Sequence, residues 1–100
     1  MENHELIPNI DILRAKSRNG SMKIFESRKT HYIGAIAKEM WRSAELGKNE
    51  AQYHTALSDN ITRKAFENAL EEFKAKGYTV ECAKEGAIGI TVNISWPLDL

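Results

Sequence analysis

The feature that most constrains this chain is a strict alternation of apolar with polar or small residues near its end. The apolar members occupy every second position: Ile88, Ile90, Val92, Ile94 and Trp96. Because side chains of a β-strand point alternately to its two faces, this spacing places all five on one face. The pattern predicts a strand over residues 88–96 with one buried face. Pro97 has no amide hydrogen for a neighbouring strand, so we expect the sheet to stop there.

A second, shorter alternation comes just before it. Tyr78, Val80 and Cys82 alternate with polar residues, which predicts a strand over 78–83 with Cys82 buried as a small apolar side chain. The residues between the two strands, 84–87, predict a turn in which Gly86 has a positive φ. We therefore expect a β-hairpin at the end of the chain.

A helix is predicted immediately before the hairpin. Its apolar residues share one stripe of a 3.6-residue helix: Ile61, Ala65, Phe66, Ala69, Leu70 and Phe73. Ser58 or Asp59 can cap the first turn, and Gly77 supplies the left-handed residue that ends many helices. In such an ending Phe73 and Tyr78 are the pair expected to make the hydrophobic contact.

The first half of the chain contains a second apolar stripe that ends at Gly47. Its members are Ile33, Ile36, Ala37, Met40, Trp41 and Ala44. We favour one helix from about 22 to 46, bent near Thr30 or Gly34, although a strand over 22–26 is the alternative. Before it, Asn9 is a possible cap for a short helix over 10–17, and 10–12 could instead begin a strand. Asn19 and Gly20 predict a turn or linker over 17–21.

The remaining pattern completes an α+β fold. Ala51, Tyr53, Thr55 and Leu57 alternate with other residues and predict a strand over 51–57. We expect a three-stranded, mostly antiparallel sheet with the last strand in the centre, in a split β-α-β arrangement plus hairpin. Two long helices would cover one face. One hundred residues predict a single domain, with 1–20 as an N-terminal docking segment and 21–100 as the α/β core.

No sequence motif of an enzyme stands out in this chain. His4, His31 and His54 have no metal-ligand spacing among themselves or with Cys82. We therefore expect no metal, no cofactor and no catalytic activity. His31, Tyr53 and His54 could form an acid–base cluster if the helix and the first strand meet. Surface histidines beside core tyrosines are the interpretation we favour.

Basic residues gather in the first third of the chain although the formal net charge is zero. The nucleic-acid candidates are Arg14, Lys16, Arg18, Arg28 and Lys29. The simpler interpretation is a solvated basic face that balances an acidic C-terminal part.

Apolar and aromatic residues offer a surface for a protein partner. The candidates are Leu6, Ile7, Ile10, Leu13 and Trp41. The segment before residue 20 is too apolar for a free tail, so we expect it to dock on its own domain or on a second copy of the chain. No apolar run approaches the length of a membrane span, and a lone cysteine favours the cytoplasm.

The C-terminal half resembles a group of small tailed-bacteriophage proteins. The resemblance rests on the run from Ala75 to Val80, Ala-Lys-Gly-Tyr-Thr-Val, followed by a turn and then Ile94-Ser95-Trp96. It covers roughly half of the chain and implies a bacteriophage origin, with a role as a virion component or a host-directed inhibitor. Our leading hypothesis is a non-catalytic protein that binds another protein or itself as a homo-oligomer. A nucleic-acid-binding accessory protein is the alternative.

Overall fold

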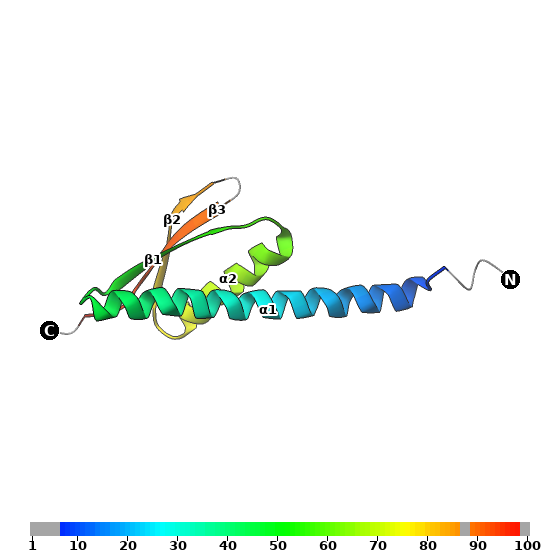
Figure 1. Ribbon diagram of the computed structural model, residues 1–100, viewed down its shortest axis with the longest axis horizontal. Coiled ribbons are helices and arrows are strands. Elements are labelled where there is room, and N and C mark those ends of the chain that lie inside the picture. Colours follow the sequence, from blue (N-terminus) through cyan, green and yellow to red (C-terminus); the bar gives the residue numbers. More distant parts are fainter. Residues whose placement is uncertain (1–6, 87–88, 99–100) are drawn as a thin grey trace.

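The computed structural model describes residues 7–86 and 89–98. It contains two helices, α1 (Ile10–Glu45) and α2 (Asn60–Ala75), and three strands, β1 (Glu50–Ala56), β2 (Thr79–Glu85) and β3 (Gly89–Ser95). Figure 1 shows the long helix α1 running beneath the sheet and well past it. The α+β class predicted from the sequence is confirmed.

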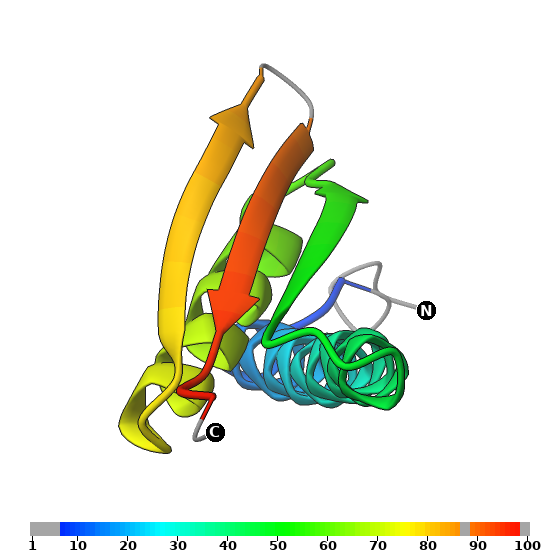
Figure 2. The same cartoon turned by 90° about the vertical axis from the view of Figure 1, so that its left-hand side faces the viewer.

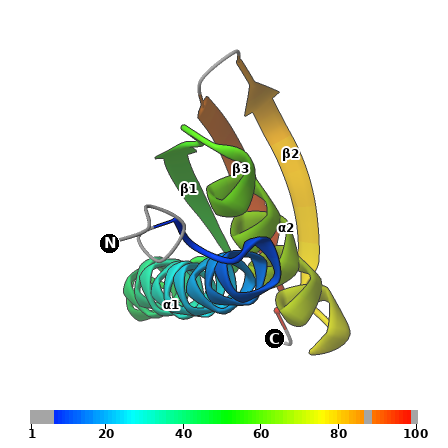
Figure 3. The ribbon, with the colours of Figure 1, turned by 90° about the vertical axis from the view of Figure 1, so that its right-hand side faces the viewer.

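The three strands form one antiparallel sheet in the order β1-β3-β2. Val92 in the central strand lies opposite Tyr53 of β1 and Cys82 of β2. Because both outer strands are antiparallel to β3, they run parallel to each other, and α2 connects them. This is the expected split β-α-β arrangement. Both helices lie on the same face of the sheet (Figures 2 and 3).

The core lies between that face and the two helices. Its largest fully buried side chains are Phe66, Ile36, Ile94 and Val92. Ile90 and Trp96 are partly buried and pack against this cluster, so the alternation that predicted β3 is confirmed from Ile90 onward. Ile88, the first member of the pattern, lies outside the described residues.

The two ends of α2 follow from its sequence. Asp59 is the N-cap, and its side chain accepts a hydrogen bond from the backbone N–H of Thr62 at 2.7 Å. At the other end the Tyr78 N–H donates to the carbonyl of Phe73 at 3.2 Å, and the Gly77 N–H donates to that of Lys74. Gly77 has a φ of +98°. The rings of Phe73 and Tyr78 pack edge to face with centroids 6.0 Å apart, as the Schellman ending requires.

Replacing Gly77 with valine is expected to lower the free energy of unfolding by about 1 kcal/mol or more. A Cβ built at Gly77 meets nothing within 4 Å, so the loss arises from the left-handed backbone and not from a clash. Urea denaturation would measure it. Gly77→Asn is the control, since asparagine tolerates this conformation and should lose less. Equal stability of all three proteins would contradict the assigned role of Gly77.

Helix α1 differs from the expectation in its length. It is one helix of 36 residues, so the predicted turn at 17–21 is wrong, as are a separate helix over 10–17 and the alternative strands. Neither Asn19 nor Gly20 removes a backbone donor as proline does, so the hydrogen-bond ladder continues, at a cost of about 1 kcal/mol for the glycine. The predicted cap Asn9 is confirmed, because its side chain accepts from Asp11 and Ile12. The helix stops at Glu45, just before Gly47.

The structure of the hairpin also differs from the one predicted. Cys82 is exposed, not buried, because β2 is an edge strand whose outer half rises beyond α2 (Figure 3). The positive φ expected at Gly86 is absent, since the glycines with positive φ among the described residues are Gly47 and Gly77. The Gly86 N–H instead donates to the Gly89 carbonyl at 2.8 Å. The predicted turn also begins too early, because Lys84 and Glu85 belong to β2 and pair with Thr91 and Ile90. Ala87, its last residue, lies outside the described residues.

Candidate interaction surface

Burial divides α1 into two parts. Tyr32, Ile36 and Met40 are buried against the rest of the domain, whereas residues 10–19 are all exposed. Figure 1 shows this N-terminal part extending away from the sheet and from α2, and the molecule measures 76 × 26 × 19 Å as a result. We call residues 10–24 the projecting half of α1. At 1.5 Å per residue its length is about 22 Å.

The projecting half exposes large apolar side chains to solvent. They are Ile10, Ile12, Leu13, Met22 and Ile24. Ile7, just before the helix, is exposed as well, while the candidate Leu6 lies outside the described residues. Single exposed apolar residues are common, but several on one stretch of helix make it a candidate interaction surface. The described part of the predicted docking segment therefore does not pack on its own domain.

Trp41 lies at the opposite end of α1 and does not belong to the same surface. Its side chain is 72% exposed, whereas its neighbour Met40 is 8% exposed, because two consecutive helical residues cannot both point inward. Trp41 borders an apolar groove of about 330 Å³. The groove is lined by Ala37, Met40, Trp41, Ala44, Phe73, Tyr78 and Trp96. The sequence patterns indicated Phe73, Tyr78 and Trp96 only as core residues, so their part in this groove was missed.

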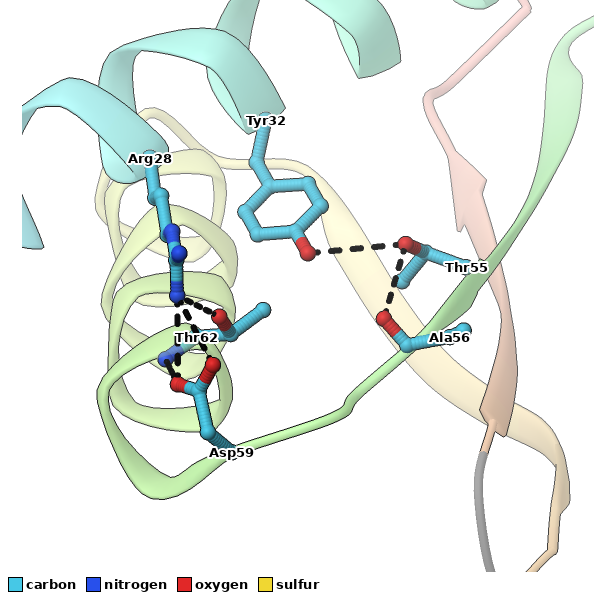
Figure 4. Close-up of polar contacts among 6 residues, drawn as sticks. All are labelled: Arg28, Tyr32, Thr55, Ala56, Asp59 and Thr62. Atoms are coloured by element: carbon cyan, nitrogen blue, oxygen red, sulfur yellow. Dashed lines mark hydrogen bonds and ion pairs between the residues drawn. The ribbon is translucent and has the colours of Figure 1, made fainter.

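The five basic candidates are separated by the fold. Arg28 pairs with Asp59 at 3.0 Å and also donates to the Thr62 hydroxyl (Figure 4). Lys29 pairs with Glu72 at 2.9 Å, and this hydrogen bond raises the pKa of Lys29. Both residues thus hold α1 to the two ends of α2.

The other three basic candidates lie on the projecting half. They are Arg14, Lys16 and Arg18, all exposed. The structure records no ion pair for them within residues 7–86 and 89–98. The basic surface on the projecting half therefore contains three of the five predicted residues.

Asp59 should make folding stability depend on pH. The Thr62 backbone N–H, the Thr62 hydroxyl and Arg28 together hold its pKa below the usual range, in that order of size. Since the pKa is lower in the folded state, the charged carboxylate stabilises the protein above its unfolded pKa. That contribution is lost as the pH falls through the folded pKa.

We expect the difference in free energy of unfolding between the natural protein and Asp59→Asn to shrink as the pH falls from about 7 to about 3. Urea denaturation at several pH values would measure it. Asparagine keeps the capping oxygen and removes only the charge. A difference that stays constant across this range would contradict the proposed electrostatic contribution.

The possible acid–base cluster is not assembled. His31 packs on Tyr32, with ring centroids 5.7 Å apart, and the ring centroids of Tyr32 and Tyr53 are 6.4 Å apart. His54 alternates to the other face of the sheet, where its Nδ1 is 2.7 Å from the Thr91 hydroxyl. Burial raises the pKa of Tyr53, which keeps its hydroxyl neutral. The tyrosines contribute to packing, and the two imidazoles lie apart.

The described residues contain neither a metal-binding cluster nor a membrane-spanning helix. No group of three or more His, Cys, Asp or Glu side chains is placed to hold a metal ion there. No helix in that part of the chain is long and apolar enough to cross a bilayer. The resemblance to bacteriophage proteins stays a prediction. Comparison of the chain with protein-family models, curated proteins and solved structures finds no match.

Proposed function

We propose that this chain is a non-catalytic protein that binds another protein through the projecting half of α1. The observation that carries the proposal is that residues 10–24 form a helix without packing on the domain, while exposing Ile10, Leu13 and Ile24 along one side of it. An isolated helix of about 15 residues is marginal in water even for alanine-rich sequences. This one contains Gly20 and three isoleucines, which favour helix less. A partner that covers its apolar side chains would stabilise it.

The biological setting follows the resemblance of the C-terminal half. Small tailed-bacteriophage proteins with this ending support a role as a virion component or as a host-directed inhibitor. A single exposed thiol at Cys82 suits a reducing compartment, and we place the protein in the host cytoplasm. A small domain that presents one long helix fits either role.

Binding of nucleic acid is the second candidate, supported by the exposed Arg14, Lys16 and Arg18. It predicts an affinity that falls steeply with salt concentration. The ion pairs of Arg28 and Lys29 with α2 take two cations away from such a surface. We rank this candidate below protein binding for that reason.

Site-specific photo-cross-linking in the cells that naturally produce the chain would test the proposal. A benzophenone side chain replaces Leu13 on the projecting half or, as a control, Gln52, which is exposed on β1. We expect a protein adduct from position 13 that resists nuclease, and none from position 52. A nuclease-sensitive adduct would support the nucleic-acid candidate instead. Adducts from position 52 alone, or from neither position, would overturn the proposal.

A further inference from the structure

Five residues of the projecting half recur at alternating steps of three and four: Ile10, Leu13, Ser17, Gly20 and Ile24. This is the spacing of the a and d positions of a coiled-coil heptad, and it places all five on one stripe of the helix. We call this stripe the seam. By helical geometry it lies roughly a third of a turn around α1 from Tyr32, Ile36 and Met40. The seam is therefore a separate face and not a continuation of the core-facing stripe.

A shallow hollow lies on the N-terminal part of the seam. Its volume is about 330 Å³, and it is lined by Ile10, Leu13, Arg14, Ser17 and Arg18. The first four have the relative positions i, i+3, i+4 and i+7. A set of four neighbouring residues on one helix forms the hole that receives a side-chain knob from a facing helix in coiled coils. Ser17 and Gly20 at the middle of the seam allow another helix to approach closely, because the interaxial distance depends on the side chains at the contact.

The charges beside the seam all have one sign. In the heptad the flanking e and g positions of the projecting half are Arg14, Lys16, Ser21 and Lys23. The two acidic residues of this part of α1, Asp11 and Glu26, occupy b and c positions away from the flanks. Charges at e and g determine which partner a coiled-coil helix accepts. A basic margin selects a helix with an acidic margin.

The same margin disfavours a second copy of this chain. In a parallel pair, g faces the e position five residues later on the partner, which places Lys23 near Arg28, a residue beyond the projecting half that also pairs with Asp59. In an antiparallel pair g faces g, which places Lys16 against Lys23. Like charges meet in both orientations, and no acidic residue lies on either margin to compensate.

A lipid surface fits the seam less well than a helix does. A helix that lies on a bilayer buries a continuous bulky apolar face, whereas Ser17 and Gly20 interrupt this one. Ile12 and Met22, the other exposed apolar residues, lie outside the seam and do not widen it into such a face.

We propose that the seam binds one amphipathic helix of a different protein, with apolar a and d residues and glutamate or aspartate at e and g, in a two-stranded coiled coil. This inference rests on the proposed function and names its partner class. Ile10, Leu13 and Ile24 supply the apolar contacts, and Ser17 and Gly20 allow the close approach. Arg14, Lys16 and Lys23 select for an acidic partner.

Titration of the full chain with three synthetic 21-residue helical peptides would test the inference. The first has leucine and isoleucine at a and d with glutamate at e and g; the second carries lysine at e and g; the third has the residues of the first in scrambled order. Calorimetry at low and at high salt measures each affinity, and light scattering reports self-association of the chain. Two variants complete the design: Ile24→Lys on the seam, and Ile12→Lys as the matched control outside it.

We expect the acidic peptide to bind at least about tenfold more tightly than the other two, with an affinity that falls as salt rises. Ile24→Lys should weaken that binding about tenfold or more, and Ile12→Lys should leave it within about twofold. Equal binding of the acidic and scrambled peptides, or no binding of the acidic one, would overturn the inference. So would a dimer of the chain that dissociates in the Ile24→Lys variant. Anionic lipid vesicles, titrated into the chain in the same way, are the remaining comparison, and tighter binding to them than to the acidic peptide would also overturn the inference. A protein adduct from position 13 alongside any of these results would leave the proposed function standing and remove only the helical, acidic partner.

Discussion

Replacing Phe66 with alanine is expected to lower the free energy of unfolding by about 3–5 kcal/mol. Phe66 belongs to α2, is fully buried and packs against α1 and the first strand. Its ring centroid is 5.0 Å from that of Tyr32 on α1 and 6.2 Å from that of Tyr53 on β1. Alanine would remove the aromatic contacts and leave a cavity where three elements meet. Domains of this size are stable by about 5–15 kcal/mol, so the loss would approach global unfolding.

Guanidinium denaturation followed by circular dichroism would measure this change. Phe66→Leu is the matched control, because it retains most of the apolar volume and should lose less than about 1.5 kcal/mol. A Phe66→Ala protein as stable as the leucine variant would show that Phe66 is not at the centre of the core.

The isoleucines of α1 provide the second large effect. Ile36 is 0% exposed and Ile12 is 63% exposed, although both belong to the same helix. Ile36→Ala is expected to lower the free energy of unfolding by about 2–5 kcal/mol. Ile12→Ala should change it by less than about 0.5 kcal/mol, because it touches no packed surface and alanine favours helix more than isoleucine does.

Denaturant titration of both variants at one protein concentration would make the comparison, since the chemical change is the same and only burial differs. Similar losses at positions 36 and 12 would mean that the projecting half packs on the domain. That result would remove the basis for an interaction surface there.

Much of the fold could be predicted because local and long-range signals agree. In α2 the apolar stripe, the Asp59 cap and the Gly77 ending all specify the same helix. The alternation in β3 specified its buried face, and the fullest apolar pattern marked it as the central strand. Where several signals point to one structure, sequence patterns are sufficient.

The errors arose where one local signal was weighed alone. Asn19 and Gly20 are frequent in turns, yet a helix tolerates both when its ladder is continuous on either side. Cys82 alternates correctly with its neighbours, but alternation gives the face of a strand and not whether anything covers it. An edge strand that extends past its helix leaves such a residue exposed.

The candidate site could be predicted only in part. Exposed apolar residues such as Ile10 and Leu13 were identified from composition, but the seam requires an unbroken helix through Gly20, which the turn signal concealed. Arg28 and Lys29 were among the nucleic-acid candidates because sequence does not show that Asp59 and Glu72 fold against them. Charges that pair across α1 and α2 are distant in sequence, so their partners emerge only from the tertiary structure.

The central claim is that one part of α1 packs on the domain and the projecting half does not. Hydrogen exchange along α1 tests this claim most directly. In the monomer, confirmed by light scattering, the amides of residues 14–24 should exchange at least on the order of 100-fold faster than those of residues 32–44. The buried Tyr32, Ile36 and Met40 protect the second group through global stability. Comparable protection of both groups in the monomer would contradict the account.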